Sequence, residues 1–545
     1  MKRRRFFVKK QRLAIIDMGS NSIRLVINLI EDNGSYKELH NFKKVARLSS
    51  HLNEIGELSR QGQELIVTTL KQFKQLMTYH QVDRVIGVAT AAMRKASNRD
   101  EVLSLIKKET GFQIKVLSEY EEAYFGYLAV VNSTSIENGI TIDIGGGSTE
   151  ITRFENRKLL HYHSFPFGAI TLQHEFIAGD DATTDELKKL KQYILDSFQT
   201  LPWLKEGKPV PVIGIGGSAR NLSLIQQRKV GYPLAGLHQY SFSVNELVSV
   251  NALLQQTSLN ERQSIDGLSK DRADLIVPAA QVITSLVEFT GADVFVMSRK
   301  GLRDGLFYKE ILSQLDIDLF PSVAEESFYQ LSYQYEIHSD HVNQVSKLAA
   351  SLFKQLVPFY QSEYTNKESL RLLRYSARVV YLGEHINNEA SSQHTFYLLT
   401  NMTIDGLSHD ERLAVALISS FKSKAQLLQL SRPFENLLTK KQLKYYEFLG
   451  AVLKLAYCLD RTRRNVISEI GQIDKSDQHL TIPLYYREDV HFEEAQANKH
   501  VKHLEKAMKR EIVLTFNAEK SRITKNASIG AKSSMSSKHD VKEES

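Results

Sequence analysis

Two short stretches of the chain share one pattern, Asp-x-Gly-x-x-Ser, and each follows a run of apolar residues. They span residues 17–22 and 143–148. Glycines allow positive φ and let backbone N–H groups approach an anion closely, as in phosphate-binding loops. An aspartate does not bind phosphate itself, but its carboxylate can hold a hydrated Mg²⁺ that does. The two stretches therefore predict a pair of loops that hold a chain of phosphates from both sides.

The presence of two copies is itself informative. A single copy would indicate little more than a turn, because one arises by chance in roughly one chain in ten of this length. Two copies that each end a β-like run favour internal duplication. In both, apolar residues resume after the small ones, at Ile23 in the first copy and Ile151 in the second. Each copy is typical of a strand, a glycine-rich tip and a second strand.

A third glycine-rich stretch, residues 214–220, follows an apolar run at 210–213. It could bind further phosphates, with Arg220 nearby. Taken by itself it is a weak signal.

Residues 118–123 follow an expected strand and open a helix that we expect to run to about residue 131. Ser118 and Glu121 form a capping box, in which the serine accepts the third helical N–H and the glutamate reaches back. Glu122 has no such role, and it shares a helix face with the small residue Gly126. Glu122 is therefore a candidate general base, although a first-turn glutamate that only stabilises the helix dipole is the commoner case.

Arg94 is expected at the start of a helix that follows a strand at 84–88. Open α/β sheets bind ligands beyond the carboxyl ends of their strands, so an arginine there suits a phosphate. A surface salt bridge is an equally good interpretation.

Histidines in the helical part of the chain raise the question of a metal site. They are His338, His341, His385 and His394. The HD phosphohydrolase pattern needs an adjacent His-Asp pair on a helix, and this chain has Val380 and Tyr381 where that pair should stand. We expect these histidines to be core or surface residues rather than metal ligands.

The chain divides into parts of different character. Two parts alternate strand-like and helix-like stretches, which implies layered α/β architecture in two similar halves with a cleft between them. A helix-rich part follows, then a short part with strands around a charged helix, and finally a Ser- and Lys-rich tail that we expect to be disordered. The predicted boundaries are 1–12 for a basic N-terminal tail, 13–134 and 135–312 for the halves, 313–465, 466–517 and 518–545.

The charge balance argues against a nucleic-acid-binding body. The formal net charge is +7, with 70 Lys and Arg against 63 Asp and Glu. Seven of the basic residues lie within residues 2–12, so the remainder is neutral. We expect that tail to be solvated, although it could contact an anionic partner.

No stretch is apolar and long enough for a membrane span or a signal peptide. The single cysteine, Cys458, excludes intramolecular disulfides and cysteine-based metal sites. We therefore expect a cytoplasmic protein with no membrane or nucleic-acid partner.

At these residues the chain resembles the Ppx/GppA family of exopolyphosphatases and guanosine pentaphosphate phosphohydrolases. The matching motifs stand in family order. They are AIIDMGSNSIRLVI (14–27), VATAAMR (88–94), LSEYEEA (117–123), TIDIGGGSTEI (141–151), FPFGAITL (165–172), GIGGSA (214–219), DRADLIVPAA (271–280) and GLRDGL (301–306).

The resemblance implies a fold of two ribonuclease-H-like halves, as in actin and sugar kinases, followed by an all-α HD-like domain and a small α+β C-terminal domain. It implies a homodimer, and the residues Val380 and Tyr381 argue that the helical domain binds or dimerises rather than catalyses. It places the catalytic glutamate on Glu122 and the Mg²⁺-linked carboxylates on Asp143 and Glu150. The residues around the phosphates would be Ser20, Asn21, Arg24, Arg94, Gly145, Gly146, Gly147, Ser148, Gly217 and Ser218.

The expected activity is hydrolysis of terminal phosphoanhydride bonds of inorganic polyphosphate, dependent on Mg²⁺ or another divalent cation, with water activated by Glu122. The length and helical extension favour polyphosphate. Guanosine pentaphosphate is a close alternative, because the motifs are shared and no base-binding pocket is visible in the sequence. An actin-like ATP-dependent kinase is disfavoured by residues 117–123. A non-catalytic polyphosphate or alarmone sensor would be expected to lack the catalytic glutamate.

Overall fold

The computed structural model of this chain describes residues 8–360, 364–476 and 479–519. Contacts divide the chain into two compact units. The first consists of Met1–Gln330 and Thr403–His409, and the second of Leu331–Met402 and Asp410–Ser545.

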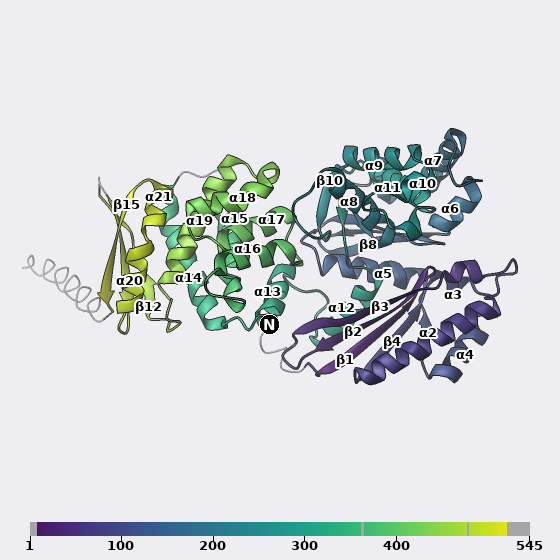
Figure 1. The fold of residues 1–545 in the computed structure, drawn as a ribbon, viewed down its shortest axis with the longest axis horizontal. Helices are drawn as coiled ribbons and strands as arrows, with labels where there is room; N and C mark the ends of the chain where they lie inside the picture. The colour runs from purple at the N-terminus through teal and green to yellow at the C-terminus, as the bar shows by residue number, and fades with distance from the viewer. Residues whose placement is uncertain (1–7, 361–363, 477–478, 520–545) are drawn as a thin grey trace, which may run out of the picture. The chain divides into compact units, whose positions relative to one another are not determined.

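The first unit contains two sheets with one topology (Figure 1). The five-stranded sheet has the strand order β3-β2-β1-β4-β5, and the six-stranded sheet has the order β10-β11-β9-β6-β7-β8. In each sheet three consecutive antiparallel strands are followed by two parallel ones, β4 and β5 in the first and β9 and β11 in the second. This repeat confirms the internal duplication predicted from the two motifs.

The strands of these sheets are β1 (Gln11–Met18), β2 (Ser22–Ile30), β3 (Tyr36–Val45), β4 (Arg84–Ala89), β5 (Ile114–Val116), β6 (Gly139–Ile144), β7 (Thr149–Glu155), β8 (Lys158–Phe165), β9 (Val212–Ile215), β10 (Tyr240–Ser243) and β11 (Val294–Met297). The helices that accompany them are α2 (Arg60–Tyr79), α3 (Ala91–Lys95), α4 (Arg99–Thr110), α5 (Glu119–Val131), α6 (Ala169–Phe176), α7 (Thr184–Gln199), α8 (Gly216–Lys229), α9 (Val244–Gln256), α10 (Leu259–Arg262), α11 (Ile276–Thr290), α12 (Leu302–Gln314) and α13 (Val323–Gln334).

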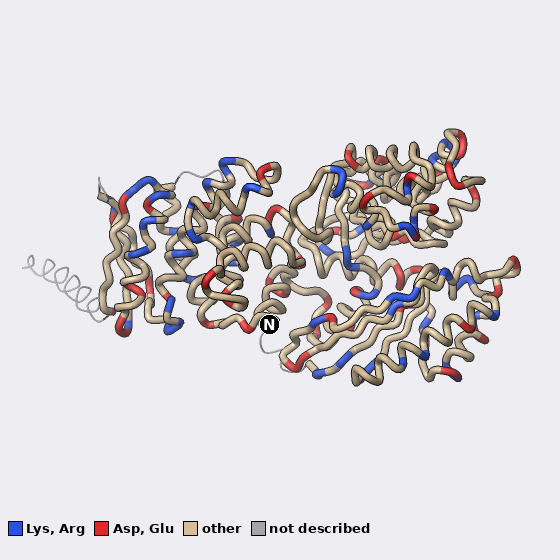
Figure 2. The backbone as a smooth tube through the Cα atoms, viewed as in Figure 1, with Lys and Arg blue, Asp and Glu red and all other residues tan. Residues whose placement is uncertain are grey.

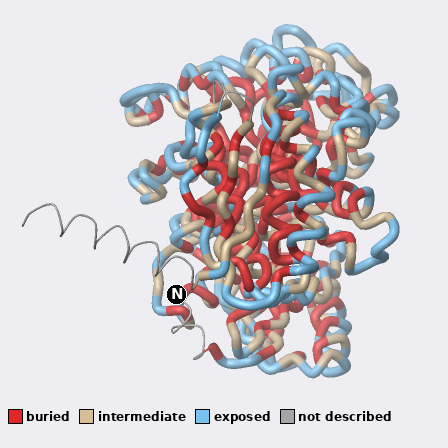
Figure 3. Tube along the Cα trace, turned by 90° about the vertical axis from the view of Figure 1, so that its left-hand side faces the viewer, coloured by how far each residue is buried: buried red, intermediate tan, exposed pale blue. Residues whose placement is uncertain are grey.

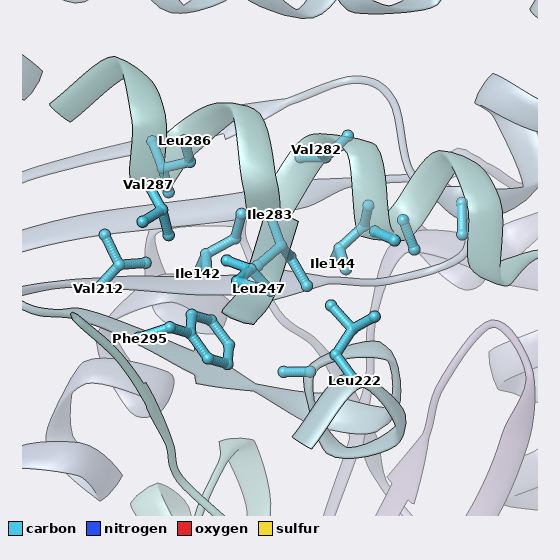
Figure 4. Close-up of a cluster of buried hydrophobic side chains, with 14 of the residues drawn as sticks. Ile142, Ile144, Val212, Leu222, Leu247, Val282, Ile283, Leu286, Val287 and Phe295 are labelled. Atoms are coloured by element: carbon cyan, nitrogen blue, oxygen red, sulfur yellow. The ribbon is translucent and has the colours of Figure 1, made fainter. Parts of the chain in front are cut away.

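The central strands are apolar because both faces of each sheet are covered. In β1 the run from Leu13 to Ile16 is wholly buried, as expected for a strand between two layers. Figure 4 shows how strands β6, β9 and β11 meet helices α8, α9 and α11, with Ile142, Phe295 and Ile283 among the side chains in contact. Figure 3 shows the same division along the whole trace, with buried residues inside and exposed residues on the outer turns. The hairpins that carry the two motifs are thus fixed to rigid sheets.

The second unit begins with helices and ends with a small sheet. Its helices include α14 (Ser339–Leu356), α15 (Asn366–Arg378), α16 (Ser391–Asn401), α17 (His409–Ser419), α18 (Lys424–Ser431), α19 (Lys440–Cys458), α20 (His491–His500) and α21 (Lys502–Met508). Its strands are β12 (Ile467–Ile470), β13 (Asp474–Lys475), β14 (His479–Tyr486) and β15 (Glu511–Ala518). The helical stretch and the strand-helix-strand stretch that follows were both predicted, while kinship with HD domains stays a prediction.

Several predicted boundaries differ from the structure. The N-terminal tail is shorter than 1–12, because Val8 is buried and β1 begins at Gln11, where it pairs with Ile30 of β2. The first unit extends past 312 to Gln330, because the buried side chain of Phe320 belongs to its core.

The C-terminal boundaries also move. Residues 466–517 belong to the second compact unit rather than standing apart. One reason is that the Ile467 carbonyl accepts a 2.6 Å hydrogen bond from Gln344 of α14. The last strand includes Ala518, and the predicted disorder of the tail otherwise concerns residues outside the described ones, as does most of the N-terminal tail.

Within the described ranges, no helix is long and apolar enough to cross a membrane.

Candidate active site

The two motif loops have the same backbone geometry. In the β1–β2 hairpin the Gly19 N–H donates to the Ser22 carbonyl at 3.0 Å, and in the β6–β7 hairpin the Gly145 N–H donates to the Ser148 carbonyl at 3.0 Å. Each bond closes a tight turn between two strands. The duplication therefore extends from the sheets to the loop tips.

The motif glycines do not use the positive φ that glycine allows. Neither Gly19 nor any of the three glycines at 145–147 is among the described residues with positive φ. A Cβ on Gly19 or Gly145 would lie 3.4 Å from the carbonyl oxygen of the turn, an ordinary contact. Here glycine leaves the surface of the loop bare, so that a ligand can approach the backbone closely.

The side chains at the base of the hairpins differ in charge. In the first hairpin Asp17 stands opposite Arg24, and in the second Asp143 stands opposite Glu150. Residues directly opposite in an antiparallel pair point to the same face of the sheet. Asp17 is further neutralised by Arg303 of α12, whose Nη1 lies 2.9 Å from its Oδ2. The second hairpin has two carboxylates at the equivalent position.

Helix α5 positions the candidate base. Ser118 Oγ accepts the Glu121 N–H at 3.2 Å, and the Glu121 carboxylate accepts the Ser118 N–H at 3.0 Å. The predicted capping box is thus confirmed. Because Glu121 is turned back to the helix start and to Lys115, Glu122 is the acidic side chain of the pair that faces inward.

Arg94 lies beside Glu122. Its Nη1 donates to Glu122 Oε2 at 3.0 Å and to the Leu117 carbonyl at 2.9 Å. Both side chains are mostly buried, with exposed fractions of 19% for Arg94 and 17% for Glu122. Arg94 therefore forms an interior ion pair, not the surface salt bridge considered as an alternative.

Burial is the largest influence on the pKa values of the carboxyl groups in this region. It raises the pKa of Glu122 to about 7, with the charges of Asp143 and Asp17 acting in the same direction and Arg94 opposing. Burial likewise raises the pKa of Asp143 to about 6, and it raises that of Glu150 well above its ordinary value, helped by the charge of Glu122. Repulsion among carboxylates that share a site favours their protonated forms.

The third glycine-rich stretch is the start of a helix rather than a loop. Strand β9 ends at Ile215, and Gly216 opens α8 with φ of 82°. A Cβ on Gly216 would lie 2.4 Å from Asp143 Oδ1, and one on Gly217 would lie 2.3 Å from the guanidinium carbon of Arg272. Gly216 needs glycine because of its positive φ, and at Gly217 an added Cβ would require the Arg272 guanidinium to move.

These elements enclose a pocket of about 610 Å³ in the first unit. Most residues predicted for the site line it: Ser20, Asn21, Arg24, Glu122, Asp143, Gly145, Gly146, Ser148, Glu150 and Gly217. Three predicted residues do not line the pocket but contact residues near it. Arg94 binds Glu122, the Gly147 carbonyl accepts Lys95 Nζ at 2.8 Å, and Ser218 Oγ lies 3.5 Å from Arg272 Nη1.

Sequence reasoning gave no role to several residues of the pocket. Arg272 and Arg303 line it together with Arg24 and Arg220. The pKa of Arg24 is lowered to about 10 by burial and then by Arg303, with Arg220 and Arg272 adding to the effect. The signal was present, because Arg272 and Arg303 lie inside the motifs at 271–280 and 301–306. Only the tertiary fold brings these arginines to one pocket.

The carboxylates suit a hydrated magnesium ion. Among the described residues, no three His, Cys, Asp or Glu side chains could hold a metal by themselves. Mg²⁺ is usually bound through one or two carboxylates, several waters and substrate phosphates. Asp143 and Glu150 offer such a pair on one face of the β6–β7 hairpin, and a cation there would offset the cost of burying their charged forms, which is the main cause of their raised pKa values.

Among the described residues of the helical region, no group of His, Cys, Asp and Glu could hold a metal ion. His341 Nδ1 lies 2.8 Å from Asp460 Oδ2, and both residues are buried. His338 caps α14, accepting the His341 N–H. These histidines therefore belong to no metal-binding group among the described residues.

The duplicated sheets and the matching hairpins, which line one pocket, define an actin-like α/β protein. A family model of the Ppx/GppA phosphatase family matches residues 26–314, and a model of domain III of the same family matches residues 323–505. The chain belongs to the Ppx/GppA phosphatase family.

Its similarity to individual relatives is moderate. It is 23% identical to a guanosine-5'-triphosphate,3'-diphosphate pyrophosphatase of Aeromonas hydrophila over 481 residues, which is 86% of this chain and 92% of that protein. It is 25% identical to exopolyphosphatase 1 of Mycobacterium leprae over 311 residues, 56% of this chain and 91% of that protein.

Two solved structures resemble about half of the chain. The Aquifex aeolicus member of the family is 28% identical with a TM-score of 0.50, and it covers 56% of this chain and 99% of its own. An exopolyphosphatase from Cytophaga hutchinsonii is 25% identical with a TM-score of 0.52, over 56% and 98% of the two chains.

Proposed function

We propose that this phosphoanhydride hydrolase removes the terminal phosphate from inorganic polyphosphate, with Glu122 as the general base. The observation that carries the proposal is the Glu122 carboxylate, held beside Arg94 in a pocket that is also lined by two glycine-rich hairpins and five arginines. A pKa near 7 suits a group that must take a proton at neutral pH.

In the proposed reaction, Glu122 accepts a proton from water while the water oxygen forms a bond to the terminal phosphorus. The bridging P–O bond breaks, and the shortened chain leaves with the electron pair of that bond. The products are orthophosphate and a polyphosphate one unit shorter. No side-chain nucleophile is needed, because positioning and electrostatics carry most of the catalysis of phosphoryl transfer.

Charge on the transferred group would be offset by the residues around it. Arg94 keeps donors that are not used by Glu122 and the Leu117 carbonyl. Backbone N–H groups of the two hairpins supply further donors. Asp143 and Glu150 would hold Mg²⁺, which when bound neutralises phosphate charge and orients the terminal group.

The arginines favour a substrate with many phosphates. Arg24, Arg220, Arg272 and Arg303 lie close enough to affect one another's protonation, and Arg220 Nε is buried with no hydrogen-bond partner among the described residues. Arginine matches phosphate oxygens in a bidentate manner. A polyphosphate chain that continues from the terminal phosphate would supply an acceptor for Arg220 Nε and further acceptors for the remaining N–H groups of these arginines.

Guanosine pentaphosphate is the second candidate. It is favoured by the relatives that match 86% of this chain, which carry the name guanosine-5'-triphosphate,3'-diphosphate pyrophosphatase. The chemistry at Glu122 would be the same, because the bond that breaks is again a terminal phosphoanhydride.

The test is orthophosphate release with Mg²⁺ from long-chain polyphosphate and from guanosine pentaphosphate, measured side by side with Glu122→Gln as the control. We expect a larger kcat/KM for polyphosphate and loss of both activities in the variant. A larger kcat/KM for the nucleotide would replace polyphosphate by the second candidate. Full activity in folded Glu122→Gln would contradict the assignment of the base.

A further inference from the structure

A group of basic side chains converges in the second unit, apart from the residues described above. Its centre is Lys454 of α19, which is 6% exposed. Lys454 Nζ donates to the Lys422 carbonyl at 2.6 Å and lies 3.4 Å from His503 Nε2 of α21. A buried ammonium group is costly unless it is paired or hydrogen-bonded, and neither of these partners is an acid.

The contact with Lys454 fixes the tautomer of His503. A lysine ammonium has only donors, so His503 Nε2 must accept and the ring proton must be on Nδ1. The His500 ring lies parallel to it, with centroids 5.9 Å apart and planes 16° apart. His500 Nδ1 is buried and has no hydrogen-bond partner in the described part of the chain. The two imidazoles therefore have ring nitrogens that are not used by the protein.

Four exposed lysines surround this centre: Lys422, Lys499, Lys502 and Lys506. None of them forms an ion pair with another described residue. The segment 499–510 has five Lys and Arg and one acid, Glu505. That carboxylate accepts the Ile512 N–H at 3.1 Å. Figure 2 draws these lysines in blue; helix α20 also carries two acids, Glu493 and Glu494, in its first turn. We call Lys422, Lys454, Lys499, His500, Lys502, His503 and Lys506 the α19–α21 basic cluster.

The protonation of the cluster reflects this crowding. Burial lowers the pKa of Lys454 to about 8, and the charges of Lys422, Lys502 and Lys499 act in the same direction. Burial and then the charge of Lys454 lower the pKa values of His500 and His503 to about 4. An anion in contact with these groups would favour their charged forms and remove the repulsion.

We propose that the α19–α21 basic cluster binds a phosphate anion with two or more negative charges. Phosphate oxygens match the donors of the cluster, namely lysine ammonium groups and imidazole N–H groups on neighbouring elements. The site is separate from the pocket of the first unit and does not rest on the proposed function. Two sources share this chemistry, a distant stretch of a phosphate chain and a small phosphorylated effector.

The test uses the full chain with Glu122→Gln, so that the ligand is not hydrolysed, and tripolyphosphate as the probe. Calorimetric titrations compare Lys499→Gln/Lys502→Gln with Lys440→Gln/Lys475→Gln, a control that removes two exposed lysines of the same unit outside the cluster. We expect two classes of tripolyphosphate site in the parent and the control. In the cluster variant the dissociation constant of one class should rise by at least about tenfold.

A local readout keeps the test independent of the pocket. The imidazole NMR signals of His500 and His503 should shift on addition of tripolyphosphate, and their pKa values should rise. Identical titrations for the cluster variant and the control, with no shift of either imidazole, would overturn the proposal. Because no turnover is measured, this result would leave the assignment of Glu122 untouched.

A second arm separates the two sources in the active chain. If the ligand is the substrate chain, Lys499→Gln/Lys502→Gln raises KM for long polyphosphate several-fold and leaves KM for tripolyphosphate unchanged. If it is an effector, pyrophosphate or a guanosine polyphosphate changes the rate in the parent and not in the variant. Either result supports an anion site and identifies its ligand.

Discussion

The two hairpins of the first unit have one backbone and opposite electrostatics. Each places an aspartate at the end of a strand, and each pairs it with the residue seven positions later, Arg24 after Asp17 and Glu150 after Asp143. The first pair is a cation and an anion, while the second is two anions whose pKa values are both raised by burial. The same turn can therefore suit two kinds of ligand, and the residue opposite the aspartate on the neighbouring strand determines which kind.

The two hairpins therefore suit different ligands within the pocket. The first hairpin, with Arg24 and Arg303 around Asp17, suits phosphate oxygens. The second, with Asp143 and Glu150, suits a divalent cation. Glu122 lies on α5, which links the first sheet to the second in the sequence, and it is the group that can join the two parts in one reaction. The predictions below test this division.

The largest effect is expected for Glu122→Gln. Loss of a general base typically reduces the rate by about 10²–10⁴-fold, and glutamine still accepts a hydrogen bond from Arg94. The fall should appear in kcat, measured by orthophosphate release under saturating substrate and Mg²⁺. Arg84→Gln, which removes an exposed ion pair with Glu310, is the control and should keep full activity.

The pH dependence of the same variant provides a second check. Glu122 must be deprotonated to act, so kcat/KM of the parent should rise with pH up to about 7.

Stability should change in the opposite direction, because the folded state raises the pKa of this carboxyl. Its contribution is full below the ordinary pKa of 4.5 and is lost as pH rises through about 7. At pH 8 Glu122→Gln should therefore melt at a higher temperature than the parent, and a lower one would contradict the burial argument.

The two aspartates should respond unequally to the same substitution. Asp143→Asn removes a carboxylate from the expected cation site, so the Mg²⁺ concentration for half-maximal activity should rise on the order of 10²-fold. Asp17→Asn leaves the two acids of the second hairpin in place and frees Arg303, and we expect a less than tenfold change in that concentration. Titrations of activity with Mg²⁺ measure both. Equal shifts would show that the hairpins do not differ in the way proposed.

The part of the site that could be predicted from sequence is local. The hairpins, the capping box of Ser118 and Glu121, and the inward position of Glu122 depend on residues close together in the chain. Arg303 and Thr403, which begins the segment Thr403–His409 of the first unit, could not be placed in this way, because only the tertiary fold brings them to the pocket. For a related reason, the sequence could not show whether the motif glycines use a positive φ. A glycine in a loop indicates either a positive backbone φ or a close approach of another group to the backbone, and the sequence alone does not tell these two reasons apart.

Two glycines of the pocket should differ in their tolerance of alanine. Gly216→Ala requires a strained φ and a Cβ 2.4 Å from Asp143 Oδ1, so it should destabilise the fold by more than about 1 kcal/mol and weaken Mg²⁺ activation. Gly145→Ala places its Cβ 3.4 Å from the nearest atom at an ordinary φ, and its effect on stability should be below about 1 kcal/mol. Chemical denaturation measures both, and equal losses would contradict the close approach of Asp143 to α8.

The smallest effect is expected at the capping box, which gives Glu121 a structural role that its neighbour Glu122 does not have. Ser118→Ala removes the acceptor of the Glu121 N–H and should lower the free energy of unfolding by about 1 kcal/mol. Because α5 is also held by packing of its buried residues, including Ala123, Gly126 and Tyr127, Glu122 should stay in place and kcat should change less than twofold. Denaturation and orthophosphate release measured on the same sample test this. A fall in kcat as large as that of Glu122→Gln would show that the cap acts in catalysis, and the distinction between Glu121 and Glu122 would then be lost.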